Sequence, residues 1–474
     1  MQVEKKQFFA ASAWVQGAWV RDVLLTVDAN GLWCGIQPNT SLADRANAKL
    51  LTGPVLPGLV NAHSHAFQRA IAGLTERRGI SGAAASDDFW SWRDRMYSVA
   101  MRITPIQLEH IASMLYAELL TAGYTQVCEF HYLHNSIDGK PYADPLEMSL
   151  ALVRAAQRVG MGLTMLPTLY MRSGFGAKGL RDDQCRFAST PDSVLKLVEG
   201  IQRQVDDFSD INVGVAVHSL RAADKTAVEE VATFAQKKAL PVHIHIAEQT
   251  QEVEDCISHT GRRPIEWLHE HVSLDSRWNL VHATHTTPDE LKAVYNSDAS
   301  IVICPSTEAN LGDGVFDYSG YSTMGGQWSI GSDSHVTRSW TEELRLLEYS
   351  QRLTQRKRNV AAQTGKNLSS ASVLFEAALG GGRSATAKNL GGIRVGNRAD
   401  FLILNSQSAA LLGIPCEYLL DALVFSSPDA QFINVFVAGN QVLASTKNCG
   451  DQLKQESWSQ VKQDFEQTMR HLWV

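Results

Sequence analysis

Two short segments of the sequence each carry a pair of histidines two positions apart. His63 and His65 lie in "NAHSHAF", and His243 and His245 lie in "HIHIAE". Residues two apart in a β-strand face the same side of the sheet. Two neighbouring imidazoles on one buried face are costly unless they share a ligand, and imidazole is a common ligand of zinc. The spacing therefore predicts a metal site at the ends of two strands.

The two histidines of the second pair are expected to differ in depth. If "HIHIAE" ends a strand inside a barrel, His243 lies about 6–7 Å deeper than His245. We therefore expect His245 to bind the metal and His243 to be a structural residue in the layer beneath. Glu248 follows where the strand gives way to a loop, so it can approach a metal-bound water without being a ligand; the alternative is a surface loop carboxylate.

Asp333 in "IGSDS" supplies a carboxylate at the end of another apolar run. An aspartate at such a point is also a common helix cap or turn residue. Together with His63, His65 and His245 it completes a set of three histidines and one carboxylate, which leaves a position for water. A zinc ion lowers the pKa of such a water to about 7, and Asp333 is expected to accept its proton. We predict one Zn2+ per chain, although the same donors accept Fe2+, Mn2+ or Co2+.

His282 in "NLVHATH" is a further histidine at a strand end. It could bind a second metal ion, hydrogen-bond the attacking water or the substrate, or belong to the core. The fourth apolar run ends in His218, so it offers no lysine that could be carbamylated to bridge two metal ions. One metal ion is therefore favoured, with His282 as an electrophilic or orienting group.

These residues require strands that bring their ends together. Short apolar runs recur along the chain, mostly separated by helix-length segments, and they cover residues 55–63, 125–131, 162–170, 211–218, 240–248, 279–283, 300–305 and 328–334. The pattern predicts an α/β fold with a parallel (β/α)8 barrel, in which active sites lie at the carboxyl ends of the strands. An open doubly wound sheet is the alternative, but no G-x-G-x-x-G follows the first run.

Both ends of the chain read as short strands with turns. We expect residues 1–53 and 390–474 to form one small β-sandwich, with a terminal helix in the second segment, and residues 54–389 to form the catalytic barrel.

Composition limits the possible partners. The net charge of -7 and the absence of a basic block argue against nucleic acid or an acidic membrane. No run reaches about 18 apolar residues, so no membrane span is expected. The seven dispersed cysteines, without a C-x-x-C pair, are typical of a reducing cytoplasm. A small-molecule substrate fits best.

Five motifs in order resemble the deaminase branch of the amidohydrolase superfamily: "PGLVNAHSH", "HIHIAE", "LVHATH", "CPSTEANLGDG" and "IGSDS". The resemblance covers nearly the whole chain. It implies that the ligands are His63, His65, His245 and Asp333. It also implies that Glu248 shuttles a proton to the leaving amine and that His282 assists the attack.

A narrower set of segments resembles the formimidoylglutamate deiminases: "HSHAFQRAIAGL", "DDFWSWRDRMY", "CEFHYLHN", "VHSLRAA" and "HIHIAEQTQEVEDC". This likeness implies hydrolysis of N-formimino-L-glutamate to N-formyl-L-glutamate and ammonia in histidine degradation, by a homodimer. The implied substrate contacts are Gln68, Arg93, Tyr132, His218 and Arg221. Two arginines suit this substrate because guanidinium groups bind carboxylates bidentately and the substrate carries two.

Three alternatives remain open at this point. A mononuclear deaminase acting on a nucleobase or an S-adenosylhomocysteine-like substrate would not need Arg93 or Arg221. A binuclear hydrolase of cyclic amides would hold two metal ions. A catalytically inactive scaffold would hold none. The loop that closes over the substrate is also open, with the Gly/Ala/Ser-rich residues 78–88 as a candidate.

Overall fold

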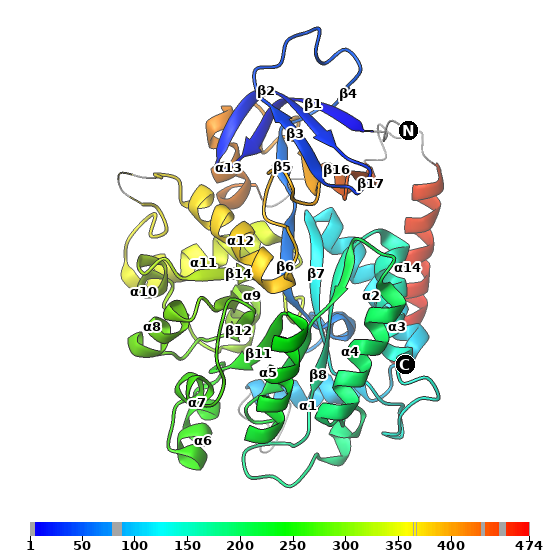
Figure 1. Cartoon of the computed structure of the whole chain (residues 1–474), viewed down its shortest axis with the longest axis vertical. Helices are drawn as coiled ribbons and strands as arrows, with labels where there is room; N and C mark the ends of the chain where they lie inside the picture. Colours follow the sequence, from blue (N-terminus) through cyan, green and yellow to red (C-terminus); the bar gives the residue numbers. More distant parts are fainter. Residues whose placement is uncertain are drawn as a thin grey trace.

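The computed structural model describes residues 5–77, 88–363, 365, 367–427, 432–444 and 452–473. Most of the candidate loop at 78–88 therefore lies outside the described residues. Two sheets organise the described chain, a barrel and a second sheet at one end of it (Figure 1). Within the described residues, no helix is long and apolar enough to cross a membrane.

The barrel consists of parallel strands that neighbour one another in chain order. They are β6 (Leu59–Ser64), β7 (Tyr124–His131), β8 (Gly162–Leu169), β10 (Val215–Ser219), β11 (Val242–Ile246), β12 (Trp278–His282), β13 (Ser300–Ile303) and β14 (Gln327–Ile330). A parallel bridge between Ser64 and Asp333 joins the first strand to the residues that follow the last. The predicted (β/α)8 barrel is confirmed.

Helices surround the barrel, along its sides and at its amino end. They are α2 (Pro105–Thr121), α3 (Glu147–Val159), α4 (Pro191–Val205), α5 (Lys225–Lys238), α6 (Thr250–Thr260), α7 (Pro264–His271), α8 (Pro288–Asn296), α9 (Pro305–Leu311), α10 (Tyr318–Thr323), α11 (Trp340–Gln355) and α12 (Ser370–Thr386). Thr-Pro pairs start α2, α4 and α8, where the threonine hydroxyl caps the helix and proline takes the first position. Side chains thus set where these helices begin.

The second sheet is built from both ends of the chain. Its strands are β1 (Lys6–Val15), β2 (Ala18–Val27), β3 (Trp33–Gln37), β4 (Lys49–Leu50), β5 (Val55–Pro57), β15 (Phe401–Leu404), β16 (Phe432–Val437) and β17 (Asn440–Ala444). They form one continuous hydrogen-bonded sheet, in which β5 joins β1 to β15. The sheet has its own core, where the ring of Phe8 lies 5.2 Å from that of Phe401 and 5.5 Å from that of Phe436.

Two predicted strands differ from those observed. The first run, residues 55–63, divides between the two sheets, because β5 pairs in the terminal sheet and the barrel strand begins at Leu59. The chain changes sheet at Gly58, where a Cβ would meet the side chain of Thr125. The fourth run is interrupted at Gly214, so β9 (Ile211–Val213) and β10 share its residues.

The last described helix, α14 (Gln452–Leu472), packs mainly on α2 at the side of the barrel (Figure 1). Thr468 hydrogen-bonds His110 of α2 at 3.0 Å. Trp473 then donates its indole N–H to the carbonyl of Ala70, also at 3.0 Å. Ala70 ends the short helix η1 (Ala66–Ala70), which directly follows His65, so the end of the described chain contacts a segment next to the predicted metal site.

Candidate active site

The four predicted metal ligands converge at the carboxyl ends of β6, β11 and β14. Nε2 of His245 lies 3.0 Å from Nε2 of His63 and 3.3 Å from Nε2 of His65. Oδ1 of Asp333 lies 3.4 Å from Nε2 of His63 and 3.4 Å from Nε2 of His65. Tetrahedral zinc with bonds of about 2.0–2.1 Å requires donors about 3.3–3.4 Å apart. These separations suit such an ion. That the four residues bind a metal stays a prediction.

Backbone carbonyls fix the orientation of two of these rings. Nδ1 of His65 donates to the carbonyl of Phe130 at 2.9 Å, and Nδ1 of His245 donates to the carbonyl of His218 at 2.8 Å. The Nε2 lone pairs are then free to bind a metal ion. Burial lowers the pKa of both rings and lowers that of His63 to about 3, so the three histidines are neutral at neutral pH.

The backbone of Asp333 forms two hydrogen bonds with the end of β6 and the residue that follows it. Its N–H donates to the carbonyl of His63 at 3.0 Å, and its carbonyl accepts from the N–H of His65 at 3.3 Å. Burial opposes ionisation of the carboxyl group, but the neighbouring histidines outweigh it and lower its pKa. The backbone of Asp333 is left-handed, with φ of 45°, a strained conformation that persists because the surrounding contacts impose it.

His243 lies apart from this cluster, in the position that strand alternation predicts. Its Nε2 donates to the carbonyl of Ala385 at 2.8 Å, in the last turn of α12. Burial lowers the pKa of His243 to about 4, which keeps the ring neutral. This contact is structural, and it lies in the layer of the barrel beneath the histidine–aspartate cluster.

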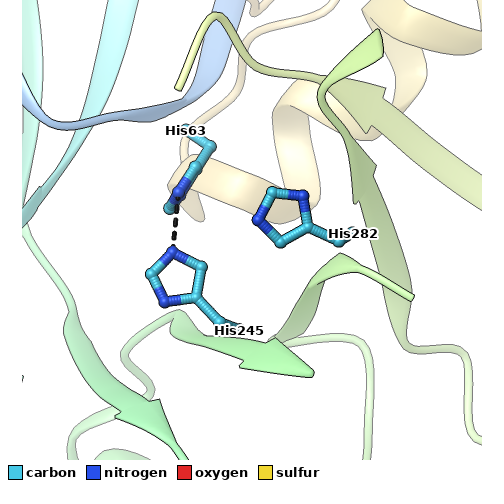
Figure 2. Close-up of side chains that lie close together, drawn as sticks. All are labelled: His63, His245 and His282. Carbon is cyan, nitrogen blue, oxygen red and sulfur yellow. Dashed lines mark hydrogen bonds between the residues drawn. The ribbon is translucent and has the colours of Figure 1, made fainter. Parts of the chain in front are cut away.

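His282 lies beside the cluster, with its ring stacked 5.6 Å from that of His245 (Figure 2). Its Nε2 is 3.7 Å from Oε1 of Glu248 and 3.8 Å from Oδ2 of Asp333. Its Nδ1 donates to Oε1 of Glu308 at 3.3 Å. Burial disfavours the charged ring, but the three carboxylates outweigh burial and raise the pKa of His282 to about 10.

Glu308 contacts His282, and the sequence reasoning did not single it out. It lies on α9. Oε1 of its carboxylate accepts the backbone N–H of Cys304 at 2.8 Å as well as the hydrogen bond from His282, and the bond from Cys304 fixes its position. The motif "CPSTEANLGDG" contains it, but nothing in the motif indicates that a carboxylate five residues beyond the end of β13 contacts the histidine of the neighbouring strand.

Glu248 lies directly beyond β11 and is 5% exposed. Burial raises the pKa of its carboxyl group to about 7, although the charges of His282 and Arg221 oppose that rise. A carboxyl group with this pKa exchanges a proton readily near neutral pH. This property suits the proton transfer predicted for it.

A pocket opens beside these groups. It is lined by His65, Gln68, Phe89, Trp92, Arg93, Met96, Tyr97, Tyr132, Tyr170, His218, Arg221, His245, Glu248, His282, Leu311 and Asp333. All five predicted substrate contacts are among these residues. The residues that sequence reasoning missed come largely from α1 (Phe89–Ala100), whose helical spacing of positions 89, 92, 93, 96 and 97 places them on one face.

Two guanidinium groups in the pocket form no salt bridge within the described residues, although, against the effect of burial, the charges of Glu252 and Glu248 raise the pKa of Arg221. Arg93 and Arg221 both lie over the ring of Trp90, with Cζ 4.5 Å and 5.6 Å from its centroid. In each arginine, Nε is buried and has no hydrogen-bond partner. Uncompensated buried donors of this kind are costly unless a ligand satisfies them.

The loop that carries Arg221 is braced by a further arginine. Arg172, just beyond β8, donates to the carbonyls of Leu220, Arg221 and Ala223 at 3.0, 3.1 and 2.8 Å. This brace fixes the loop backbone and hence the position of the Arg221 side chain.

The remaining predicted contacts form one wall of the pocket. Gln68 donates to the hydroxyl of Tyr132 at 3.4 Å, and its own carbonyl oxygen is buried without a partner. The ring of His218 packs 4.2 Å from that of Tyr170 and 5.3 Å from that of Tyr132. This wall offers both a hydrogen-bond acceptor and aromatic surface.

The barrel, the sheet from both termini and the histidine–aspartate cluster at the strand ends define a class of hydrolases. Residues 55–442 match the model of the Amidohydrolase family, and the chain belongs to that family. It is 43% identical, over 96% of its length and 98% of the relative's, to formimidoylglutamate deiminase of Pseudomonas aeruginosa. It is also 24% identical, over 81% of its length and 80% of the relative's, to 5-methylthioadenosine/S-adenosylhomocysteine deaminase of Shouchella clausii.

A solved structure agrees with this assignment. The crystal structure of an amidohydrolase from Brucella melitensis superposes with a TM-score of 0.89 at 38% identity, covering 99% of this chain and 100% of that one. The predicted membership of the amidohydrolase superfamily is therefore confirmed.

Proposed function

We propose that this hydrolase converts N-formimino-L-glutamate and water to N-formyl-L-glutamate and ammonia. One observation carries the proposal: Arg93 and Arg221 lie unpaired in the same pocket as the histidine–aspartate cluster. A substrate with two carboxylates would satisfy both guanidinium groups. The 43% identity to a formimidoylglutamate deiminase supports the same substrate.

The proposed cofactor is one Zn2+ held by His63, His65, His245 and Asp333. When bound, this ion would act as a Lewis acid and lower the pKa of a water molecule. Donors of this type also accept Fe2+, Mn2+ or Co2+, so elemental analysis of the purified protein is the direct test.

The side chains around the cluster divide the proton transfers between them. The water oxygen bonds to the formimino carbon as the C=N double bond opens, and Glu248 carries a proton from the water to the nitrogen. Asp333 accepts the second water proton, which reaches the same nitrogen as the C–N bond breaks and ammonia leaves. His282 orients the water through the nitrogen that faces Glu248 and Asp333.

The alternatives have less support from the pocket. A neutral nucleobase would leave both guanidinium groups unpaired. A second metal ion would need a bridging ligand from the fourth strand, and that strand ends near His218, without a lysine that could be carbamylated. A scaffold without catalysis would not need four converging donors.

The test is an ammonia-release assay with the metal-loaded protein. N-formimino-L-glutamate should yield equimolar ammonia and N-formyl-L-glutamate, identified by mass spectrometry. N-formiminoglycine, which has a single carboxylate, is the control substrate and should show a higher KM. Ammonia release from adenosine or 5-methylthioadenosine, with none from the formimino substrate, would overturn the proposal.

We further propose a place in histidine degradation, in the cytoplasm and as a homodimer. The resemblance to formimidoylglutamate deiminases and the dispersed cysteines support this setting. A deletion strain fed histidine should accumulate the formimino substrate, and sedimentation should give twice the chain mass. A normal metabolite profile would contradict the pathway, and a monomer would contradict the assembly.

A further inference from the structure

Two tyrosines and a glutamine form a closed hydrogen-bond group in the wall of the pocket. Tyr97 comes from α1, Tyr170 directly follows β8, and Gln184 lies on the short helix η3 (Asp182–Phe187). All three are nearly inaccessible, with exposures of 2%, 3% and 0%. The two tyrosines line the pocket, whereas Gln184 lies behind them.

The direction of the glutamine amide is fixed. The backbone N–H of Arg181 donates to Oε1 of Gln184 at 3.1 Å, so the NH2 group must face the tyrosines. This NH2 donates to the hydroxyl of Tyr97 at 3.3 Å and to that of Tyr170 at 3.0 Å. Both of its protons are then in use, and both hydroxyls act as acceptors.

The two hydroxyl groups carry two protons, and only one of these protons forms a hydrogen bond within the group. They lie 3.2 Å apart, so one hydroxyl donates to the other. The accepting hydroxyl still has its own proton, and neither oxygen has a further acceptor among the described residues. A hydroxyl proton rotates about the C–O bond, so this one is free to turn toward a ligand that reaches the hydroxyl.

The surroundings indicate what this donor would meet. The guanidinium of Arg93 lies 5.5 Å from the centroid of the Tyr97 ring, and the ring of Tyr170 packs on His218. Burial raises the pKa of Tyr170 well above its ordinary value, so its hydroxyl keeps its proton. A neutral donor beside cationic donors suits a carboxylate, which accepts several hydrogen bonds at once.

We propose that Tyr97 and Tyr170 act as a single shared donor that, with Arg93, binds one carboxylate of the substrate and so helps to select a dicarboxylate. This inference rests on the proposed function for the identity of the substrate. Gln184 is the positioning residue of the pair, because its amide holds both hydroxyls as acceptors.

A double-mutant cycle tests the sharing. In Tyr97→Phe or Tyr170→Phe alone, the remaining hydroxyl has no tyrosine to donate to, so its proton stays available. Each single variant should therefore raise KM by less than about 2-fold, so that the product of the two single effects stays well below the effect of the double variant. The double variant loses the donor and should raise KM by about 10-fold or more, the scale of a hydrogen bond to a charged group. Values of kcat should stay within about 3-fold, and Tyr349→Phe, on the outer side of α11, is the matched control.

Two outcomes would overturn the shared donor. One is a double variant whose KM rises only by the product of the two single effects, and the other is a loss that falls on kcat.

Monocarboxylate substrates give a second test, using N-formimino-4-aminobutanoate and N-formimino-2-aminobutanoate. The penalty of the double variant should vanish for the analogue that lacks the bound carboxylate and persist for the other. Equal penalties for both analogues would contradict the proposal.

Failure of the proposed function would be separately visible. In that case the wild-type protein would release no ammonia from N-formimino-L-glutamate. Calorimetric titration with N-formyl-L-glutamate then decides the inference without turnover. Binding that weakens about 10-fold only in the double variant supports the shared donor, and equal or absent binding in all variants overturns it.

Discussion

At the scale of single residues, the site depends on groups that hold the reacting side chains. His65 and His245 each donate one ring nitrogen to a backbone carbonyl, and His282 donates one to Glu308. These bonds fix which nitrogen faces the centre of the cluster. The position of Glu248, by contrast, leaves its carboxyl group beside His282 and open to the pocket.

Glu248→Gln should separate catalysis from metal binding. The amide keeps the size of the side chain but cannot carry a proton, so kcat should fall by about 10²-fold or more. The metal content should stay at the wild-type value, because Glu248 is not among the four converging donors. Steady-state kinetics and elemental analysis measure the two effects. An unchanged kcat would refute the proton-transfer role.

Arg93→Ala should act mainly on substrate binding. Loss of a guanidinium that pairs with a carboxylate should raise KM by about 10-fold or more, with a smaller effect on kcat. Arg154→Ala is the matched control, because Arg154 is 43% exposed and pairs with Glu109 on the outside of the barrel. If KM stays at the wild-type value in Arg93→Ala, the residue does not bind the substrate.

At the scale of elements, α12 approaches the barrel closely enough to require glycine. Gly381 faces the backbone of Trp328 in β14, and Gly382 faces Val60 in β6, so that a Cβ at either position would clash. Gly380, the preceding residue, is exposed and has nothing near its missing Cβ. The helix therefore packs across the two strands where the barrel closes, one layer below His63 and Asp333.

Adjacent substitutions in α12 test this contact. Gly381→Ala should destabilise the protein by about 1–3 kcal/mol, because the methyl group meets backbone that cannot move easily. Gly380→Ala should be neutral or stabilise by about 0.5–1 kcal/mol, since alanine favours a helix interior. Urea denaturation monitored by circular dichroism compares them. Equal midpoints for the two variants would contradict the close packing.

Much of the barrel was predictable because its buried strands are short apolar runs with polar ends. Those ends also predicted which residues meet, since parallel strands finish at one face. The change of sheet at Gly58 was not predictable, because apolar residues continue on both sides of it. Glu308, Tyr97 and Gln184 were missed for another reason: they come from helices outside the strands, and only tertiary packing brings them to the pocket.

At the scale of the whole molecule, a buried ion pair joins the terminal sheet to the barrel. Arg398 binds Asp400 through two hydrogen bonds, at 2.9 and 2.6 Å, and also donates to the carbonyl of Thr125 at the start of β7. Asp400 accepts the N–H of Ala438 at 2.9 Å. Both charged side chains are at most 6% exposed, so each depends on the other.

Arg398→Met should reveal that dependence. Asp400 would remain buried without its partner, and stability should fall by about 3–5 kcal/mol. Arg398→Met combined with Asp400→Leu should recover part of the loss, because no unpaired charge remains. Arg470→Met, at an exposed pair in α14, is the control and should change stability by less than about 1 kcal/mol. A double variant no more stable than Arg398→Met would contradict this account.

The terminal sheet also has a consequence for synthesis on the ribosome. The ring of Phe8 packs on Phe401 and Phe436, so these two partners are made long after it. At about 5–20 residues per second, the roughly 390 residues between Phe8 and Phe401 take about 20–80 s to translate. During that interval the apolar face of β1 and β2 lacks the part of its core that Phe401 and Phe436 supply. Nascent chains should therefore recruit chaperones through their first strands and release them only after β15 and β16 emerge.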